Sequence, residues 1–235
     1  MAGPTERLLA RARDRFTVQD YYGAIYLLEE IVASGRAFAD VHHLIGVSLS
    51  LLGRPDEALA QFERALELNP RYLEALIHQG LVLVELGRRE EAEDSFRQAA
   101  ESVAPPAAGL PAPVAARLAN QHAELADAYA EAGALARAVE QYEHALELGP
   151  GFHDLRYRMA RVMLEAGRAL EAREALEDVV RARPNFVDAE AALGLAHFLS
   201  GDAVGARDIW QACLARRPEN ARVEAYLAML GRTGG

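Results

Sequence analysis

The amino-acid sequence predicts an all-α fold in which helical hairpins repeat along the chain. One small residue recurs with a fixed period, at Ala24, Ala58, Ala92, Ala138, Ala172 and Ala206. The spacings between these alanines are 34, 34, 46, 34 and 34 residues. A second series of small residues, from Ala12 to Ala228, follows the same spacings and adds one more interval of 34. Self-similarity at this period is typical of stacked helical hairpins.

Glycine and proline divide each unit into two helices. A glycine lies five residues before each repeating alanine except the first, at Gly53, Gly87, Gly133, Gly167 and Gly201. Glycine favours the left-handed turn that ends a helix. A proline, which does not continue a helix, follows four of the second helices, at Pro70, Pro150, Pro184 and Pro218. Each unit is therefore predicted to be a helix, a glycine turn, a second helix and a proline turn.

The spacing of apolar residues in the second half of each unit predicts a helix rather than a strand. In the second unit they recur at i, i+4, i+7 and i+8, at Ala58, Phe62, Ala65 and Leu66. The large side chain of Phe62 is expected to fill the space between neighbouring helices, which a small residue such as Gly46 allows to approach closely. One pair of helices alone does not bury such a stripe, so the pairs are expected to stack.

On these residues the sequence resembles the tetratricopeptide repeat family. The segment 44–70, LIGVSLSLLGRPDEALAQFERALELNP, carries most of the family's small residues, its aromatic residue and its terminal proline, although His42 stands where the family has an early tryptophan. The first repeat departs furthest, with Gln19 in place of the turn glycine and Arg36 in place of the proline. The resemblance implies an all-α, right-handed superhelical solenoid of six helix-turn-helix repeats plus a C-terminal capping helix.

The repeats implied by this resemblance form a single domain over residues 1–235. Their approximate bounds are 5–38, 39–72, 73–106, 119–152, 153–186 and 187–220, with the capping helix at 221–231. The interval of 46 residues leaves a proline-rich insertion at 107–118, which is either a bulge or an extension of the first helix of the fourth repeat. This insertion either contacts a partner or sets the angle between two halves of three repeats each, or it is a tolerated surface feature.

Composition and charge disfavour two classes of function, nucleic-acid binding and membrane insertion. The chain is 51% hydrophobic and 26% charged, as is ordinary for a globular protein. Its net charge of −10 disfavours nucleic acid as a partner, because that interaction depends on basic side chains that release counterions. The sequence shows no apolar signal segment and no stretch of the roughly 20 apolar residues that span a membrane. We expect a cytoplasmic protein with no membrane insertion, and the use of arginine to the exclusion of lysine favours a bacterial source.

No set of residues predicts catalysis, a metal site or a cofactor. The single cysteine, Cys213, excludes an internal disulfide and lies in an apolar stripe, which favours core packing. The fragment His122-Ala123-Glu124 lacks the downstream cysteine pair of a zinc deaminase. Without lysine the chain has no Schiff-base or P-loop chemistry. We therefore expect a protein that is not an enzyme.

The resemblance places the first helix of each repeat along a concave groove in which a partner binds. Continuing one helical register along these helices gives the candidate partner-binding residues His43, Val47, His78, Leu81, Val84, Tyr157, Arg158, Arg161, Leu195 and Phe198. In the sixth repeat this register runs through Ala191, Leu195 and Phe198. Apolar residues at such positions favour a helix or extended peptide of another protein. Alternatively, Leu81, Val84 and Leu195 pack against adjacent helices of the chain itself.

The two arginines of the fifth repeat have alternative roles. Arg158 and Arg161 are candidates for holding a partner's carboxylate through charge-assisted hydrogen bonds. Alternatively, both pair with carboxylates of the chain itself, namely Glu124, Asp127 or Asp154.

These features predict a non-catalytic scaffold or adaptor that binds a peptide or helix of a partner protein. The alternative is a structural protein that acts by homo-oligomeric self-assembly. Residues 119–152 carry 6 acidic residues against 1 arginine, whereas residues 153–186 carry 6 against 7, so that copies have complementary regions for head-to-tail association. The identity of a partner does not follow from the fold.

Overall fold

The computed structural model describes residues 4–35, 38–103 and 110–233, with side chains up to residue 230. Within these ranges the chain forms thirteen α-helices and no β-strand. The helices belong to two compact units, Met1–Ala104 and Pro105–Gly235. The predicted all-α arrangement of six successive hairpins and one final helix is confirmed.

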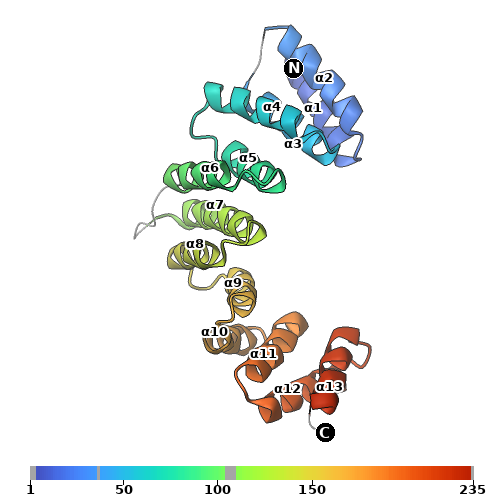
Figure 1. Cartoon of the computed structure of the whole chain (residues 1–235), viewed down its shortest axis with the longest axis vertical. Helices are drawn as coiled ribbons and strands as arrows, with labels where there is room; N and C mark the ends of the chain where they lie inside the picture. The colour runs from blue at the N-terminus through green and yellow to red at the C-terminus, as the bar shows by residue number, and fades with distance from the viewer. Residues whose placement is uncertain (1–3, 36–37, 104–109, 234–235) are drawn as a thin grey trace. The chain divides into compact units, whose positions relative to one another are not determined.

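The first unit consists of three helical hairpins (Figure 1). Its helices are α1 (Pro4–Thr17), α2 (Tyr21–Ala33), α3 (Ala39–Leu51), α4 (Pro55–Leu68), α5 (Leu73–Glu85) and α6 (Arg89–Ser102). Each helix packs against the next one in the chain, and α3 also contacts α5. The contact between α3 and α5 places the first helices of two neighbouring hairpins on one face of the unit.

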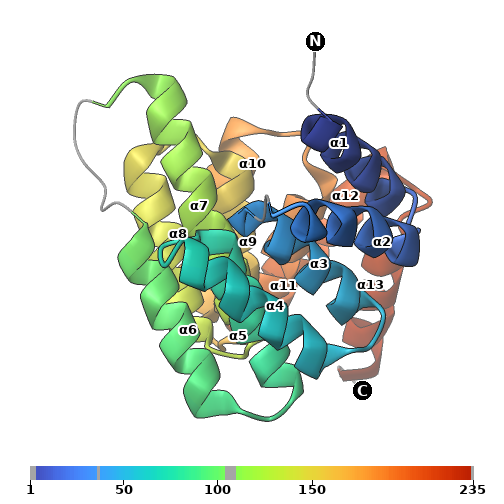
Figure 2. The same cartoon turned by 90° about the horizontal axis from the view of Figure 1, so that it is seen from above.

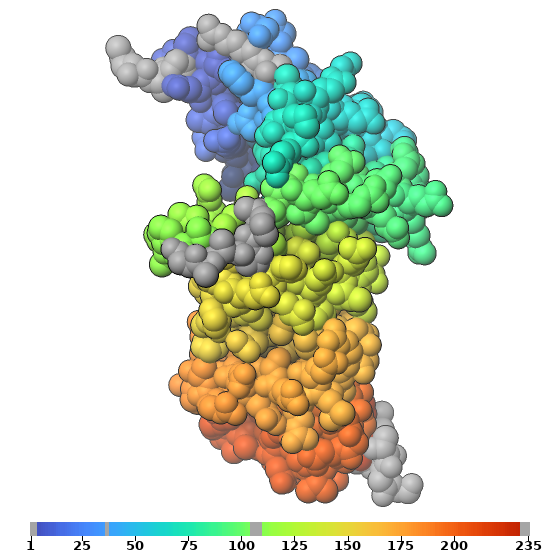
Figure 3. Space-filling view, turned by 90° about the vertical axis from the view of Figure 1, so that its left-hand side faces the viewer, coloured from blue at the N-terminus to red at the C-terminus, as the bar shows by residue number. Residues whose placement is uncertain are grey.

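The second unit consists of three further hairpins and a single last helix. Its helices are α7 (Ala112–Glu131), α8 (Leu135–Leu148), α9 (His153–Glu165), α10 (Ala169–Ala182), α11 (Val187–Leu199), α12 (Ala203–Arg216) and α13 (Ala221–Thr233). Figure 2 shows α7 lying beside α8, and the space-filling view of Figure 3 shows the later helices as successive bands of colour from yellow to red. Because α9 contacts α11 and α11 contacts α13, these three helices share one face.

The turns between the two helices of each hairpin have the left-handed backbone that the glycines predict. The five turn glycines have φ between 71° and 91°. In the first hairpin Gln19 takes the same place with φ 62°, and it is the one residue other than glycine with positive φ in the described ranges. The turn is therefore imposed by the packing of α1 on α2 even where the sequence lacks the residue that favours it.

The second helix of a hairpin begins in one of three ways. Asp20 and Asp202 precede α2 and α12, and each carboxylate accepts a hydrogen bond from the backbone N–H three residues later, at 2.9 and 2.8 Å. Arg54 precedes α4, and its guanidinium donates two hydrogen bonds of 2.7 Å to Glu57 in the first turn. Arg88 and Arg168 form the same pair with the glutamate three residues later, at Glu91 and Glu171. Ala134, before α8, has no side-chain cap.

In four of the six hairpins the core contains a large aromatic side chain packed on a small residue of the preceding helix. Phe62, Phe96, Tyr142 and Trp210 are almost completely buried, as predicted for the large residue of each repeat. The ring of Phe96 lies so close to Gly80 that a β-carbon there would meet Cε1 at 2.5 Å. Cys213 is buried beside Trp210 in a cluster with Val223 of α13, which confirms its expected core role.

The segment expected as an insertion is partly helical. α7 begins at Ala112 and has 20 residues, whereas the other helices have 13 or 14. Residues 112–118 thus follow the expected alternative of an extended first helix, with Ala115 and Leu118 buried. Residues 107–109 of the insertion and Arg36, expected in place of a turn proline, lie outside the described residues.

Candidate functional site

A pocket of about 230 Å³ lies on the face shared by α9, α11 and α13. We call it the α9–α11–α13 pocket, and its lining residues are Tyr157, Arg161, Leu164, Glu165, Asp188, Ala192, Leu195, Arg222 and Tyr226. Three of the predicted partner-binding residues, Tyr157, Arg161 and Leu195, are therefore brought together here from two helices. Apolar walls combined with a few convergent polar groups are typical of ligand sites.

The lining of this pocket includes charged and aromatic side chains. Arg222 of α13 and Asp188 of α11 form an ion pair of 3.4 Å across the face. The ring of Tyr157 packs on Phe186, with centroids 4.8 Å apart. Burial raises the pKa of Tyr157, the nearby Asp188 raises it further, and the charge of Arg161 acts in the opposite direction. The hydroxyl of Tyr157 is therefore neutral and available as a donor.

A second pocket, of about 340 Å³, adjoins the first along α9. Its lining residues are Asp127, Ala130, Glu131, Tyr142, Arg158, Arg161, Val162 and Glu165. Because both pockets include Arg161 and Glu165, they form one continuous surface from α7 to α13.

The two predicted arginines have different roles in this surface. Arg158 forms an ion pair with Asp127 and lies over the ring of Tyr142 at 5.5 Å from its centroid. The hydroxyl of Tyr142 also donates to Asp127. Arg158 thus pairs with a carboxylate of the chain itself, as the alternative interpretation expected. Arg161, in contrast, makes no hydrogen bond or ion pair with another described residue.

Of the residues in the register predicted for the sixth repeat, Leu195 lines the pocket, whereas Ala191 and Phe198 do not. Ala191 is 2% exposed, and the residues of α11 that reach the pocket are Asp188, Ala192 and Leu195. Phe198 instead packs against the cluster around Trp210, with ring centroids 6.4 Å apart. The spacing of four and three residues from 188 to 195 is the signal in the sequence that identifies this face.

In the first unit, α3 and α5 bring His43 and His78 into contact. Nε2 of His43 lies 3.2 Å from Nδ1 of His78, and Nδ1 of His43 lies 3.3 Å from the hydroxyl of Tyr72. Because Nδ1 of His78 is 2.6 Å from the backbone carbonyl of Glu74, that nitrogen carries the proton and donates it. Nε2 of His43 then faces an N–H group and is the unprotonated nitrogen of a neutral ring.

Burial and the neighbouring His78 lower the pKa of His43 to about 4. The rings of His43 and Phe62 are 6.0 Å apart, which places the imidazole against the core of the hairpin. Val47, Leu81 and Val84, the other predicted residues of this unit, are half-buried on the same two helices. The first unit therefore presents a mainly apolar face with a pair of histidines in contact.

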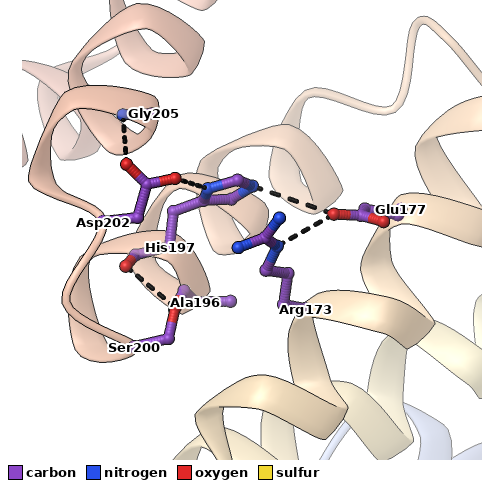
Figure 4. Close-up of polar contacts among 7 residues, drawn as sticks. All are labelled: Arg173, Glu177, Ala196, His197, Ser200, Asp202 and Gly205. Carbon is purple, nitrogen blue, oxygen red and sulfur yellow. Dashed lines mark hydrogen bonds and ion pairs between the residues drawn. The ribbon is translucent and has the colours of Figure 1, made fainter.

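A polar cluster that sequence reasoning missed joins α10, α11 and α12 (Figure 4). Nδ1 of His197 lies 2.8 Å from Asp202, the residue that caps α12, and Nε2 of His197 lies 4.0 Å from Glu177. Arg173 donates to the same oxygen of Glu177 at 2.9 Å. The sequence does contain a signal for the helix cap, because Asp202 and Gly205 repeat the pattern of Asp20 and Gly23. No pattern in the sequence identifies His197 as the partner of Asp202.

This His–Asp pair is arranged to hold helices together rather than to activate a nucleophile. The hydroxyl of Ser200, the nearest one along the chain, donates to the backbone carbonyl of Ala196 at 2.8 Å and does not bond to the imidazole (Figure 4). Burial raises the pKa of the Cys213 thiol, as does the nearby Glu190, so the thiolate is disfavoured. The hydrogen bond from Gly205 and then that from His197 lower the pKa of Asp202.

The part of the chain that the structure describes contains no group of three or more histidine, cysteine or acidic side chains placed to hold a metal ion. In the same part, no helix has the length and apolar character needed to cross a membrane.

The known proteins to which this chain is similar belong to one class. Family models described as tetratricopeptide repeat match residues 44–109 and 129–198. A curated but uncharacterized protein of Methanocaldococcus jannaschii is 40% identical over 58 residues, which are 25% of this chain and 67% of that protein. The chain belongs to the tetratricopeptide repeat family, whose members are in general protein-binding scaffolds and typically not catalysts.

Solved structures with the same fold cover most of the chain. The type IV pilus biogenesis factor PilW is similar with a TM-score of 0.67 and 18% identity, over 97% of this chain and 100% of that one. PilF of Pseudomonas aeruginosa has a TM-score of 0.63 and 16% identity, over 96% and 97%. YrrB, a protein with this repeat described as having an unusual peptide-binding site, has a TM-score of 0.58 and 18% identity, over 86% and 97%. At these identities the similarity establishes the fold.

Proposed function

We propose that this protein is a non-catalytic scaffold that binds a peptide or helix of a partner protein at the α9–α11–α13 pocket. The observation that supports this proposal most is the convergence of Tyr157, Arg161 and Leu195 on one pocket. Its polar groups lie beside apolar walls, as peptide recognition requires. YrrB, which has a similar fold, is described as having an unusual peptide-binding site, and this supports the proposal.

A substitution that fills the pocket tests this proposal. Ala192 lines the pocket and is half-buried, so that Ala192→Arg adds a large side chain there without removing a core contact. A protein captured from the source lysate by the wild-type chain is expected to be lost with this variant. Ala215→Arg, on the exposed part of α12, is the matched control and is expected to retain it. Equal retention by both variants would exclude the pocket as the binding site.

Self-assembly is a second candidate function, and a surface on α2 favours it. Tyr22 and Tyr26 are 66% and 64% exposed and lie one turn apart on the same helical face. The matching residues of the next hairpin are Asp56 and Ala60, and those of the third are Glu90 and Asp94. Two exposed tyrosines thus replace the polar or small residues that the repeat carries in the other hairpins of this unit.

Light scattering over a range of protein concentrations tests self-assembly. If α2 mediates it, the wild-type chain forms a defined oligomer and the double variant Tyr22→Glu, Tyr26→Glu remains a monomer. A wild-type chain that stays monomeric at the highest concentration would exclude this second function.

A further inference from the structure

We infer that the α9–α11–α13 pocket binds the interior of a peptide segment in which an acidic side chain lies next to an apolar one, with the carboxylate on Arg161. This inference rests on the proposed function, because it specifies the chemistry of the partner at the same pocket. It follows from the distribution of charge on the surface from α7 to α13.

Among the described residues of this surface, Arg161 is the arginine that forms no ion pair. Arg158 is paired with Asp127, and Arg222 is paired with Asp188 at 3.4 Å. Among the described residues, nothing forms an ion pair or hydrogen bond with Arg161, whose side chain is exposed. A guanidinium in this state offers up to five donors to a carboxylate, without first breaking a contact in the protein.

The residues around Arg161 determine which side chain of the ligand lies next to its carboxylate. Leu164 lies three residues further along α9, on the same helical face, and Ala192 and Leu195 complete an apolar wall. Tyr157 and Tyr226 line the same pocket. A ligand that satisfies the guanidinium and also covers this wall has an apolar side chain beside its acidic one.

The continuity of the two pockets favours the interior of a segment over a chain end. Arg161 and Glu165 belong to both pockets, so the surface extends from Arg161 toward α7 as well as toward α13. On the α7 side, Glu131 and Glu165 have no ion-pair partner in the described ranges. A bound segment therefore continues past Arg161, and a basic side chain on that side complements the two carboxylates.

Selection from a library of displayed peptides tests the inference. Random ten-residue peptides with fixed glycine flanks, which have no free C-terminus, are selected on the immobilised full-length chain, and a parallel library ends in a free C-terminus. The internal library is expected to be enriched in Asp or Glu next to Leu, Ile, Val or Phe. Removing one charged hydrogen-bond donor in Arg161→Gln is expected to weaken binding of a selected peptide by about 10- to 100-fold.

Charge reversal separates recognition from folding. Arg161→Glu is expected to select Lys or Arg where the wild type selects Asp or Glu, and a misfolded chain cannot produce this exchange. Arg207→Gln, an exposed arginine of α12 outside the pocket, is the matched control and is expected to leave affinity unchanged.

The outcomes distinguish this inference from the proposed function. Peptides selected with no acidic preference, or bound equally by the wild type and Arg161→Gln, would overturn the role of Arg161 and leave peptide binding standing. Enrichment confined to the free C-terminal library would overturn the interior position of the carboxylate. Failure of both libraries to yield binders would overturn the inference and the proposed peptide site together.

Discussion

The ring of Phe62 in α4 lies directly against Gly46 of α3, and a β-carbon on Gly46 would meet Cε1 of Phe62 at 2.6 Å. Phe62 is completely buried, so its ring has no space into which to move. Gly80 and Phe96 repeat this relationship in the next hairpin. In the fourth repeat, Ala126 stands at the position of Gly46 and Tyr142 at the position of Phe62, so alanine and glycine both occur at this position of the repeat.

This close approach predicts that Gly46→Ala destabilises the protein. Overpacking against Phe62 costs about 1–3 kcal/mol, and the higher helix propensity of alanine offsets up to about 1 kcal/mol of it. We expect a net loss of about 1–2 kcal/mol in the free energy of unfolding, measured by urea titration. Gly151→Ala is the control, because a β-carbon there meets no atom within 4 Å. Equal midpoints for the two variants would contradict the steric argument.

The left-handed backbone at Gln19 predicts that Gln19→Gly stabilises the first unit. A residue with a β-carbon is strained at φ 62°, and glycine relieves this strain. The expected gain is about 0.5–1 kcal/mol in the free energy of unfolding. The same substitution at Gln98, an exposed position inside α6, is expected to cost about 1 kcal/mol instead. A loss of stability at both positions would show that the turn at Gln19 is not strained.

The uncapped start of α8 predicts a second stabilising change. Ala134 has φ −84° and ψ 59°, close to the φ −83° and ψ 71° of Asp20, which caps α2. In Ala134→Asp the carboxylate is positioned to accept from the backbone N–H of Arg137, with an expected gain of about 0.5–1 kcal/mol. Ala134→Asn, which caps without charge, is expected to give most of this gain. Thermal unfolding of the three chains measures the effect, and identical midpoints would contradict it.

The arrangement of hairpins could be predicted from the sequence because its signals are local and repeat. A turn glycine, an apolar stripe and a proline each act within a few residues, and six copies in series reinforce one another. The first hairpin keeps the same turn although Gln19 replaces the glycine, since the packing of α1 on α2 imposes the left-handed backbone. Periodicity does not specify the exact start of α7, because the extra residues interrupt the repeat.

The candidate site was harder to predict because it depends on the rotation of each helix and on long-range pairing. Nε1 of Trp210 donates to the backbone carbonyl of Ala191 at 3.0 Å, which turns that part of α11 toward the core and places Ala192 at the pocket. Arg158 forms an ion pair with Asp127, and no spacing in the sequence specifies that pairing. The helical register was sufficient for Tyr157, Arg161 and Leu195, which the pocket unites.

The histidine pair of the first unit predicts a loss of stability on mild acidification. The pKa of His43 is about 4 in the folded chain and 6.5 when the ring is exposed, so between these values the unfolded chain binds a proton that the folded chain does not. The contribution of this histidine is therefore complete above pH 6.5 and is lost as the pH falls toward 4. At pH 5 the expected loss is about 2 kcal/mol.

His43→Leu removes this titration, so the test compares the change in unfolding free energy from pH 7 to pH 5 in the wild type and the variant. The wild type is expected to lose about 2 kcal/mol more than the variant over this range. The carboxylates titrate in both the wild type and the variant, so their contributions to the change in unfolding free energy cancel in the comparison. Because Nε2 of His43 faces the N–H of His78, a proton there has no acceptor, and the ring resists charging for a geometric reason as well as through burial. Parallel pH profiles would show that His43 accepts a proton without cost and would contradict this arrangement.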